Sequence, residues 1–278
     1  MLLKPGISLF VAVTAGAGYL FGAPDGVQSF ALLALVVGTA LTAGGSGALN
    51  HLLESAQDGL MDRTSGRPIP SGRLSRSFVL VYGTGVLWLG LGVLWLFTNA
   101  LTASLALATA VGYVAIYTPL KRRTALNTFV GAVPGALPAL GGYAAATGTI
   151  GPGGWAVFAI LFLWQLPHFF ALAWMFREDY ARGGFVMLPI TDPDGRLTSG
   201  IALGATLLLL VAGVIPAAIQ VAGWLYFGGM IILGTAFTIP AFAFAAEPSD
   251  ERARRLLLAS ILYVPAFFVL VVADYIIC

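Results

Sequence analysis

The sequence has very few charged residues. Only 9% of its 278 residues are Asp, Glu, Lys or Arg, whereas a soluble domain carries about 25%. So few charges do not cover a water-facing surface, which excludes an ordinary soluble globular protein. The 14 Lys and Arg residues against 12 Asp and Glu give a net charge of +2. This small excess gives no indication of a nucleic-acid partner.

Cysteine is also scarce, and the common nucleotide- and metal-binding motifs are missing. The single cysteine, Cys278, stands at the last position and has no partner for an internal disulfide. The sequence contains no Walker motif, CxxC pair, HExxH motif or Gly-rich nucleotide fingerprint. Any chemistry must therefore come from a different arrangement of polar residues.

Apolar residues are abundant instead, at 59% of the chain, which excludes a disordered protein. A bilayer core requires about 20 mostly apolar residues per helix, and the apolar runs lack the alternating pattern of a membrane β-barrel. We therefore predict an all-α membrane protein, a single domain over residues 1–278, with nine transmembrane helices. The predicted spans are 5–21, 29–52, 77–97, 101–117, 127–147, 154–176, 199–221, 225–245 and 256–276.

The cations all fall on one side of this nine-span topology. The connections on that side carry all 14 Lys and Arg residues, whereas the other side carries only the acids Asp25 and Asp274. The positive-inside rule makes the basic side cytoplasmic, with the N-terminus inside and the C-terminus outside. Because no transit segment precedes the first span, we expect a prokaryotic plasma membrane, with the mitochondrial inner membrane as the alternative.

Oxygen-bearing side chains recur every four residues after the second span, a spacing that places them on one face of a helix. These residues are Asn50, Glu54, Asp58 and Asp62. Mg²⁺ favours one or two carboxylates, with water and substrate phosphates completing its shell. Arg63 and Arg67 follow, and guanidinium groups suit phosphate binding. A solvated helix end with local Glu–Arg pairs is the alternative interpretation.

Two further polar segments lie on the same side. Lys121, Arg122 and Arg123 follow the fourth span, where they suit a diphosphate, a topology signal or anionic lipid headgroups. The segment Arg177-Glu178-Asp179-Tyr180 follows the sixth span, four spans after the acidic stripe. This recurrence predicts an internal duplication of a four-helix unit, with halves at about 5–117 and 127–245 and a ninth helix at 256–276.

A histidine lies within the sixth span. An ionisable residue at the depth of His168 is a candidate functional residue, and the alternative is a neutral histidine bonded to a carbonyl exposed by Pro167. Its spacing from Gln165 and Asp179 allows the three side chains to share an interior face. His51, beside the acidic stripe, faces another direction and is the weaker histidine candidate.

Together these segments resemble the UbiA superfamily of intramembrane prenyltransferases, and within it the branch that farnesylates protoheme IX. The resemblance runs in order through almost the whole chain. The strings that carry it are Asn50-x3-Glu54-x3-Asp58-x2-Met61-x-Arg63-Thr64, Arg67-Pro68, Tyr117-Thr118-Pro119-Leu120-Lys121-Arg122, Trp164-Gln165-x-Pro167-His168-Phe169 and Arg177-Glu178-Asp179-Tyr180.

The resemblance implies nine helices around a central cavity with a cytoplasmic polar mouth. It implies that Asn50, Glu54 and Asp58 hold Mg²⁺ and diphosphate at one cap and that Asp179 does so at the other. The implied phosphate- and substrate-binding residues are Arg63, Arg67, Lys121, Arg122, Arg177, Gln165 and Tyr180. Glu54 stands where many superfamily members have Asp, and the second cap lacks a three-acid repeat, so the number of metal ions stays open.

The implied reaction transfers a farnesyl group from farnesyl diphosphate to the 2-vinyl group of protoheme IX (heme B), adds water and gives heme O. Heme is then a substrate rather than a cofactor. His168 is a candidate base for the water, or a contact to the heme or its iron. Tyr113, Tyr117, Phe162 and Phe169 are candidate aromatic faces for the allylic cation. A heme A synthase or a terminal oxidase assembly is the implied protein partner.

Three other functions stay open: a UbiA-type enzyme acting on an aromatic quinone precursor, a membrane transporter and a non-catalytic assembly factor. Transporters place their binding groups near the bilayer midplane, whereas the acids here cluster at helix ends on one side. This asymmetry favours an enzyme, and the string Trp164-Gln165-x-Pro167-His168-Phe169 favours heme as the acceptor.

Overall fold

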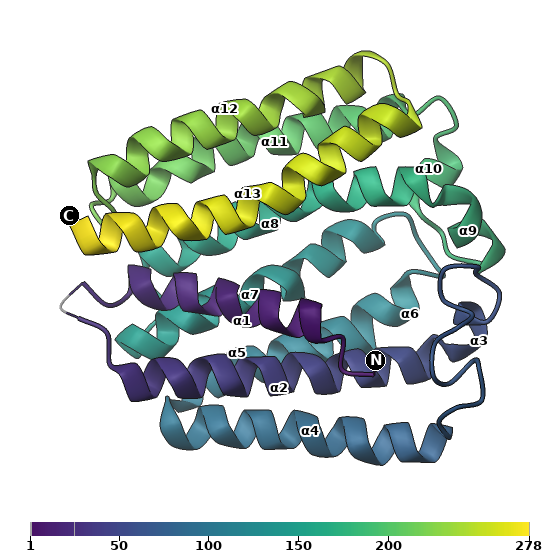
Figure 1. The fold of residues 1–278 in the computed structure, drawn as a ribbon, viewed down its shortest axis with the longest axis horizontal. Coiled ribbons are helices and arrows are strands. Elements are labelled where there is room, and N and C mark those ends of the chain that lie inside the picture. The colour runs from purple at the N-terminus through teal and green to yellow at the C-terminus, as the bar shows by residue number, and fades with distance from the viewer. Residues whose placement is uncertain (1, 25, 278) are drawn as a thin grey trace.

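The computed structural model describes residues 2–24 and 26–277. Within these residues the chain forms thirteen α-helices and one π-helical turn, without a strand (Figure 1). The long helices are α1 (Pro5–Phe21), α2 (Ser29–Leu53), α4 (Arg76–Phe97), α5 (Ala100–Val111), α7 (Asn127–Thr147), α8 (Pro152–Met175), α11 (Arg196–Ala218), α12 (Trp224–Ala246) and α13 (Asp250–Ile277). The short elements are α3 (Ser55–Asp58), η1 (Gly112–Tyr117), α6 (Thr118–Leu120), α9 (Arg177–Arg182) and α10 (Leu188–Thr191).

The predicted helical bundle is confirmed. Eight helical segments are long and apolar enough to cross a bilayer, and one of them runs without interruption from α5 through η1 and α6, over Ala100–Leu120. Helix α1 is apolar but has only 17 residues, fewer than each of these eight. The count of nine spans therefore stays a prediction that depends on α1.

The predicted boundaries differ most from the observed ones at the last helix. We expected it to begin at residue 256, but α13 begins at Asp250. Its first turn carries Asp250 and Glu251, whose negative charges are favourable at a helix N-terminus, and the Ser249 hydroxyl accepts from the backbone N–H of Arg252 at 3.4 Å. An apolar run marks only the part of a helix that lies in lipid. The sequence therefore did not predict the polar first turns of α13.

Helices α1 and α7 pack closely enough to require glycine. A Cβ atom on Gly18 would lie 1.9 Å from the carbonyl oxygen of Ala139, and one on Gly142 would lie 1.8 Å from that of Ala15. A side chain at either position would therefore push the two helices apart. Further along α7 toward its N-terminus, Gly131 and Gly135 line a cavity instead.

The connecting segments that carry Lys and Arg residues gather at one end of the bundle. Figure 1 shows α3, α9 and α10 at this end and the C-terminus at the other. Hydrogen bonds join the segments to one another: the Asp62 amide donates to Asp179 Oδ1 at 2.9 Å, and Asn127 Nδ2 donates to the Val186 carbonyl at 2.7 Å. Segments far apart in sequence thus form one polar end, as the topology predicted.

Candidate active site

A cavity of about 580 Å³ runs from the polar end into the bundle. Along α2 it is lined from Asn50 at the polar end to Leu35, fifteen residues earlier, which corresponds to roughly 22 Å of helix. Its inner part is apolar, with Leu35, Leu94 and Leu137 among the lining residues. The cavity therefore joins a charged mouth to a long apolar interior.

Three members of the predicted stripe lie together at the mouth. Asn50, Glu54 and Asp58 all line the cavity, with residue exposures of 1%, 6% and 0%. Helix α2 ends at Leu53, and the short helix α3 continues in nearly the same direction as far as Asp58 (Figure 1). The four-residue spacing thus keeps these oxygens on one side although the helix is interrupted.

The fourth member of the stripe does not join them, and here the sequence prediction is wrong. Asp62 lies beyond the end of α3, its side chain is 89% exposed, and it pairs with Arg182 at 2.6 Å. Helical spacing predicts a shared face only while the helix continues. Helix α3 ends at Asp58, with Gly59 as its C-cap. Asp62 therefore lies outside the helix, and its side chain is exposed to water.

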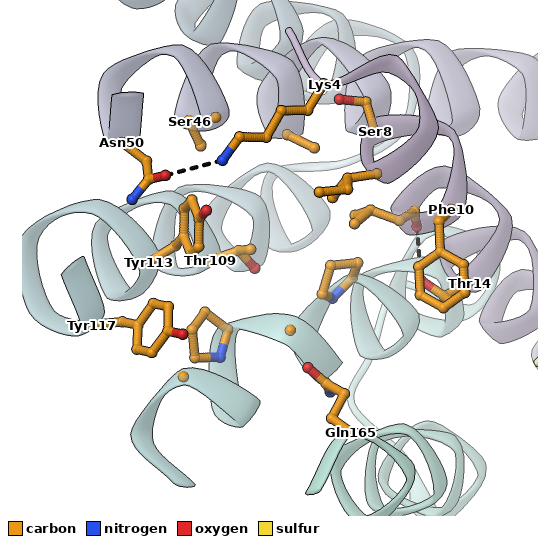
Figure 2. A pocket seen from close by; sticks show the side chains of 18 of the residues that line it. Lys4, Ser8, Phe10, Thr14, Ser46, Asn50, Thr109, Tyr113, Tyr117 and Gln165 are labelled. Atoms are coloured by element: carbon orange, nitrogen blue, oxygen red, sulfur yellow. Dashed lines mark hydrogen bonds between the residues drawn. The ribbon is translucent and has the colours of Figure 1, made fainter. Parts of the chain in front are cut away.

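Each oxygen group at the mouth has its own cation. Lys4 Nζ donates to Asn50 Oδ1 at 3.0 Å (Figure 2). Lys121 Nζ lies 2.5 Å from Glu54 Oε1, and Arg67 Nη1 contacts both oxygens of Asp58 at 2.7 Å. The mouth is therefore a buried array of alternating charges.

Burial shifts the titration of this array. It raises the pKa of Asp58 because a buried carboxylate loses hydration, and the hydrogen bond and charge of Arg67 offset only part of the shift. Burial, with the nearby positive charges of Arg67 and Lys121, lowers the pKa of Lys4 to about 7. Both groups are held where their charged forms are poorly solvated, as is common at functional sites.

The donor set at the mouth fits Mg²⁺ of the kind that binds with a substrate. Among the described residues no cluster of three His, Cys, Asp or Glu side chains forms a ready metal cage. The mouth offers two carboxylates and one amide, which suits Mg²⁺ when water and phosphate oxygens complete its shell. Glu54 Oε1 is close to Lys121 but makes no aligned hydrogen bond, so it is a buried acceptor with unused capacity.

Arg63 and Tyr180 form a second part of the mouth. Arg63 Nη2 donates to the Tyr180 hydroxyl at 3.1 Å, and the guanidinium lies 4.9 Å from the centre of the Phe176 ring. Lys121 lies over the Tyr117 ring at 4.7 Å. These aromatic faces attract the cations without neutralising them. Lys121 is also paired with Glu54, whereas Arg63 bonds to a neutral hydroxyl and keeps its charge available to an anion.

Three other predicted residues lie away from this cavity. Arg122 is exposed and does not line it. Arg177 pairs with Asp250 at 2.7 Å and lines a second, more open cleft. Phe162 stacks on Phe158 instead of lining the cavity, whereas Tyr113, Tyr117 and Phe169 do line it. Direct contacts of Arg122 and Arg177 with a diphosphate in the main cavity stay predictions.

Asp179 also lies outside the main cavity. Its Oδ1 accepts from the Asp62 amide at 2.9 Å and from Arg182 at 2.7 Å, and it lines the second cleft. Burial alone would raise the pKa of Asp179, but hydrogen bonds from Arg182 and from the amides of Asp62 and Arg63 lower it overall. Asp179 therefore ties the two polar segments together, and its role as a metal ligand stays a prediction.

The two polar residues predicted inside the sixth span do face the cavity. Gln165 Nε2 donates to the carbonyls of Leu161 at 2.9 Å and Ala132 at 3.3 Å. His168 Nδ1 lies 2.8 Å from the Ser260 hydroxyl. His51 is buried but does not line the cavity, and within residues 2–24 and 26–277 neither of its ring nitrogens has a hydrogen-bond partner.

Sequence reasoning missed three residues that complete the site. The sequence marks Lys4 only as one of the cations that set the topology, yet its side chain reaches the acidic stripe. Thr118 accepts a hydrogen bond from Asn50 Nδ2 at 3.0 Å, and Ser260 contacts His168. Each lies 46 or more residues from its partner, so spacing along the sequence carries no sign of the contact.

The UbiA prenyltransferase family matches residues 10–271 of the chain. The chain is 48% identical to protoheme IX farnesyltransferase of Salinibacter ruber over 99% of its own length and 97% of the relative. It is 41% identical to that of Solibacter usitatus, over 98% and 97%.

Solved structures share its fold at low identity. The structure of a digeranylgeranylglyceryl phosphate synthase has a TM-score of 0.82 and 17% identity, covering 99% of this chain and 96% of that one. A UbiA homologue of Archaeoglobus fulgidus, bound to DMAPP and Mg²⁺, has a TM-score of 0.71 and 18% identity, with 98% of each chain covered. With its apolar helices and its match over residues 10–271, this multi-pass membrane protein belongs to the UbiA prenyltransferase family.

Proposed function

We propose that the protein transfers a farnesyl group from farnesyl diphosphate to the 2-vinyl group of protoheme IX, with addition of water, to give heme O. The observation that carries this proposal is the cavity itself, which joins a cation-rich, oxygen-rich mouth to a long apolar interior. Relatives that bear the name protoheme IX farnesyltransferase, 48% and 41% identical over almost the whole chain, support the choice of acceptor and donor.

The diphosphate binds at the mouth in this proposal. Arg63, Arg67 and Lys121 line the same cavity as the three stripe residues, and their charges neutralise the departing pyrophosphate. Asn50, Glu54 and Asp58 would hold Mg²⁺, which supplies charge neutralisation to the leaving group when bound. A UbiA homologue of Archaeoglobus fulgidus binds Mg²⁺ together with a prenyl diphosphate, which supports this assignment.

The apolar interior holds the isoprenoid chain and excludes water. When the carbon–oxygen bond breaks, its electron pair leaves with the pyrophosphate and an allylic cation remains. Tyr113 and Tyr117, whose ring centres are 5.8 Å apart, line the cavity close to Lys121 and present aromatic faces to that cation. Excluding water at this stage prevents hydrolysis of the cation.

The acceptor then supplies the electrons for the new bond. The π electrons of the vinyl group form a carbon–carbon bond with the farnesyl cation, which leaves a carbocation on the porphyrin side chain. Water adds to this carbocation and loses a proton, giving a hydroxyethylfarnesyl substituent. His168, Phe169 and Trp164 line the part of the cavity bounded by α8 and α13, and we assign the porphyrin to this part.

The same reasoning extends to location and assembly. We place the polar end of the bundle at the cytoplasmic side of a prokaryotic plasma membrane, with the N-terminus inside, because the positive-inside rule supports it. A heme A synthase or a terminal oxidase assembly is the partner that would receive the product. Protease accessibility of tags at either end of the chain in sealed vesicles tests the orientation.

The activity is tested with membranes that contain the protein as the only prenyltransferase. Farnesyl diphosphate and Mg²⁺ are supplied with protoheme IX in one reaction and with an aromatic quinone precursor in another, and the products are identified by mass. We expect a product whose mass exceeds that of protoheme by one farnesyl group and one hydroxyl. A prenylated aromatic ring without a modified heme would overturn the proposal and assign the quinone precursor as acceptor.

A further inference from the structure

His168 makes a contact that the reaction described above does not use. Its Nδ1 lies 2.8 Å from the hydroxyl oxygen of Ser260, a residue of α13 that is fully buried. The backbone carbonyl of the same serine accepts a hydrogen bond from Trp164 Nε1 at 2.8 Å. The Trp164 ring also stacks on the His168 ring, with 5.3 Å between the ring centres. One serine therefore organises both aromatic side chains.

The direction of the histidine bond follows from the number of hydrogens available. The Ser260 Oγ lies 2.6 Å from the Leu257 carbonyl oxygen. A carbonyl only accepts hydrogen bonds, so the single hydroxyl hydrogen of Ser260 must lie in this contact. The hydroxyl then has only lone pairs to offer to His168. Nδ1 must carry a hydrogen and donate it to Ser260.

This direction fixes the form of the neutral imidazole. With the hydrogen on Nδ1, the other ring nitrogen, Nε2, carries the free lone pair. No side chain or backbone group of the described residues forms a hydrogen bond with Nε2, and the residue lines the cavity. A lone pair without a protein partner, on a half-buried side chain that lines the cavity, is available to a ligand that enters this part of it.

The surroundings favour a metal over a proton as the partner of this lone pair. A histidine that acts as a base becomes positively charged and is usually oriented by a carboxylate, but the group that holds His168 is a neutral hydroxyl. A histidine that ligates a metal stays neutral, and it needs only an acceptor for its other N–H. The Ser260 hydroxyl supplies that acceptor, and heme iron readily takes an imidazole as an axial ligand.

We propose that Ser260 and Trp164 hold His168 with its Nε2 lone pair toward the cavity, so that Nε2 ligates the iron of the porphyrin acceptor and Ser260 acts as a positioning residue. The inference rests on the proposed function, because it requires a metalloporphyrin as the acceptor. It separates the roles left open for His168 and assigns a function to Ser260. The ligand bond orients the porphyrin while its vinyl edge reacts.

The test is protoheme binding to the purified protein in the absence of farnesyl diphosphate, followed by optical spectroscopy and electron paramagnetic resonance. We expect the wild type to show an imidazole-ligated heme spectrum. His168→Ala should lose this spectrum, and added imidazole should restore it. Ser260→Ala should weaken heme binding about 10-fold or more, the scale for loss of a group that orients a ligating histidine.

Two further variants separate positioning from general disruption. Ser260→Thr keeps the hydroxyl and should bind heme within about 3-fold of the wild type. Ser104→Ala removes a similar hydroxyl, which donates to the Ala100 carbonyl at 2.8 Å on an exposed face of α5, and should change nothing. Farnesyl diphosphate binding, measured on every variant, verifies that the mouth of the cavity is intact.

Two results would overturn the inference. One is an unchanged heme spectrum in His168→Ala; the other is a Ser260→Ala variant that binds heme as tightly as Ser104→Ala does. If the wild type farnesylates protoheme and either result is found, only the role of His168 and Ser260 is wrong. If the wild type prenylates an aromatic ring and leaves protoheme unmodified, the proposed function itself fails.

Discussion

Asp58 and Asp179 are both buried carboxylates at the polar end of the bundle, but their surroundings differ. Asp58 faces the main cavity and relies on Arg67 for its charge balance, and burial raises its pKa. Asp179 accepts hydrogen bonds from a backbone amide and from Arg182, which lower its pKa. The first carboxylate therefore carries its ion pair inside the cavity, where a ligand can reach it, whereas the second bonds to groups that join two polar segments outside that cavity. The two acidic segments thus differ in their surroundings although both lie at the polar end.

The largest effect should come from Asp58. We expect Asp58→Asn to lower turnover by at least about 100-fold, the scale seen when one group that stabilises a developing charge is removed. The loss of charge also leaves Arg67 without its ion pair. Turnover is measured over a range of Mg²⁺ concentrations. Asp62→Asn is the matched control, because that side chain is 89% exposed, and should cost no more than a few-fold; near-normal turnover in Asp58→Asn contradicts the assignment.

Lys121 should come next. Lys121→Met preserves the length of the side chain but removes the cation beside Glu54. A hydrogen bond to a charged group contributes about 1.5–3 kcal/mol, so we expect the KM for farnesyl diphosphate to rise about 10- to 100-fold. Arg122→Met, at an exposed position outside the cavity, should change it about 2-fold or less. Equal effects of the two variants would show that only the net charge of this segment matters.

Asp179 should affect stability more than chemistry. We expect Asp179→Asn to lower the free energy of unfolding by about 1–2 kcal/mol, mainly through a weaker bond to the Asp62 amide, because the half-exposed Arg182 is screened by water. Thermal unfolding in detergent measures this change, with the exposed Glu178→Gln as the control. A loss of turnover as large as that of Asp58→Asn, with unchanged stability, would instead support a metal-ligand role for Asp179.

The smallest effect should be a difference in acid sensitivity. Asp179 has a lowered pKa in the folded state, so its stabilisation is present above the unfolded-state pKa and is lost as the pH falls through the folded one. Asp58 has a raised pKa, so its contribution to stability changes in the opposite direction and improves as it takes up a proton. Thermal unfolding between about pH 3 and 6 should therefore show a flatter acid decline in Asp179→Asn and a steeper one in Asp58→Asn. Identical profiles would contradict the opposite shifts.

Much of the fold could be predicted because lipid imposes a simple rule on the sequence. Apolar runs of sufficient length become helices in lipid. The positions of the Lys and Arg residues indicated which connecting segments lie together at the polar end of the bundle. The length of α13 was underestimated because Asp250–Arg255 continues the helix outside the apolar run. The internal duplication of a four-helix unit, over residues 5–117 and 127–245, stays a prediction.

The candidate site could be predicted only where spacing along one helix decides the geometry. Asn50, Glu54 and Asp58 come together because four residues make about one turn, and Asp62 departs because the helix has ended. Lys4 and Ser260 were not identified because contacts between distant helices depend on packing. The resemblance of its motif assigned Asp179 to Mg²⁺ and diphosphate binding. In the structure its carboxylate bonds to the backbone amides of Asp62 and Arg63, which the motif does not predict.

The π-helical turn η1 has a genetic consequence. The Thr118 amide reaches back five residues to the Tyr113 carbonyl, so this stretch holds one residue more than a regular helix would. Deleting one residue within it, such as Ala115, would let an ordinary helix form, and Tyr117 and Lys121 would keep nearly their present directions relative to Tyr113, because the deletion removes the additional residue that the wide turn accommodates. A codon deletion within a helix usually rotates all the residues that follow, but here it would leave the residues of the site in register.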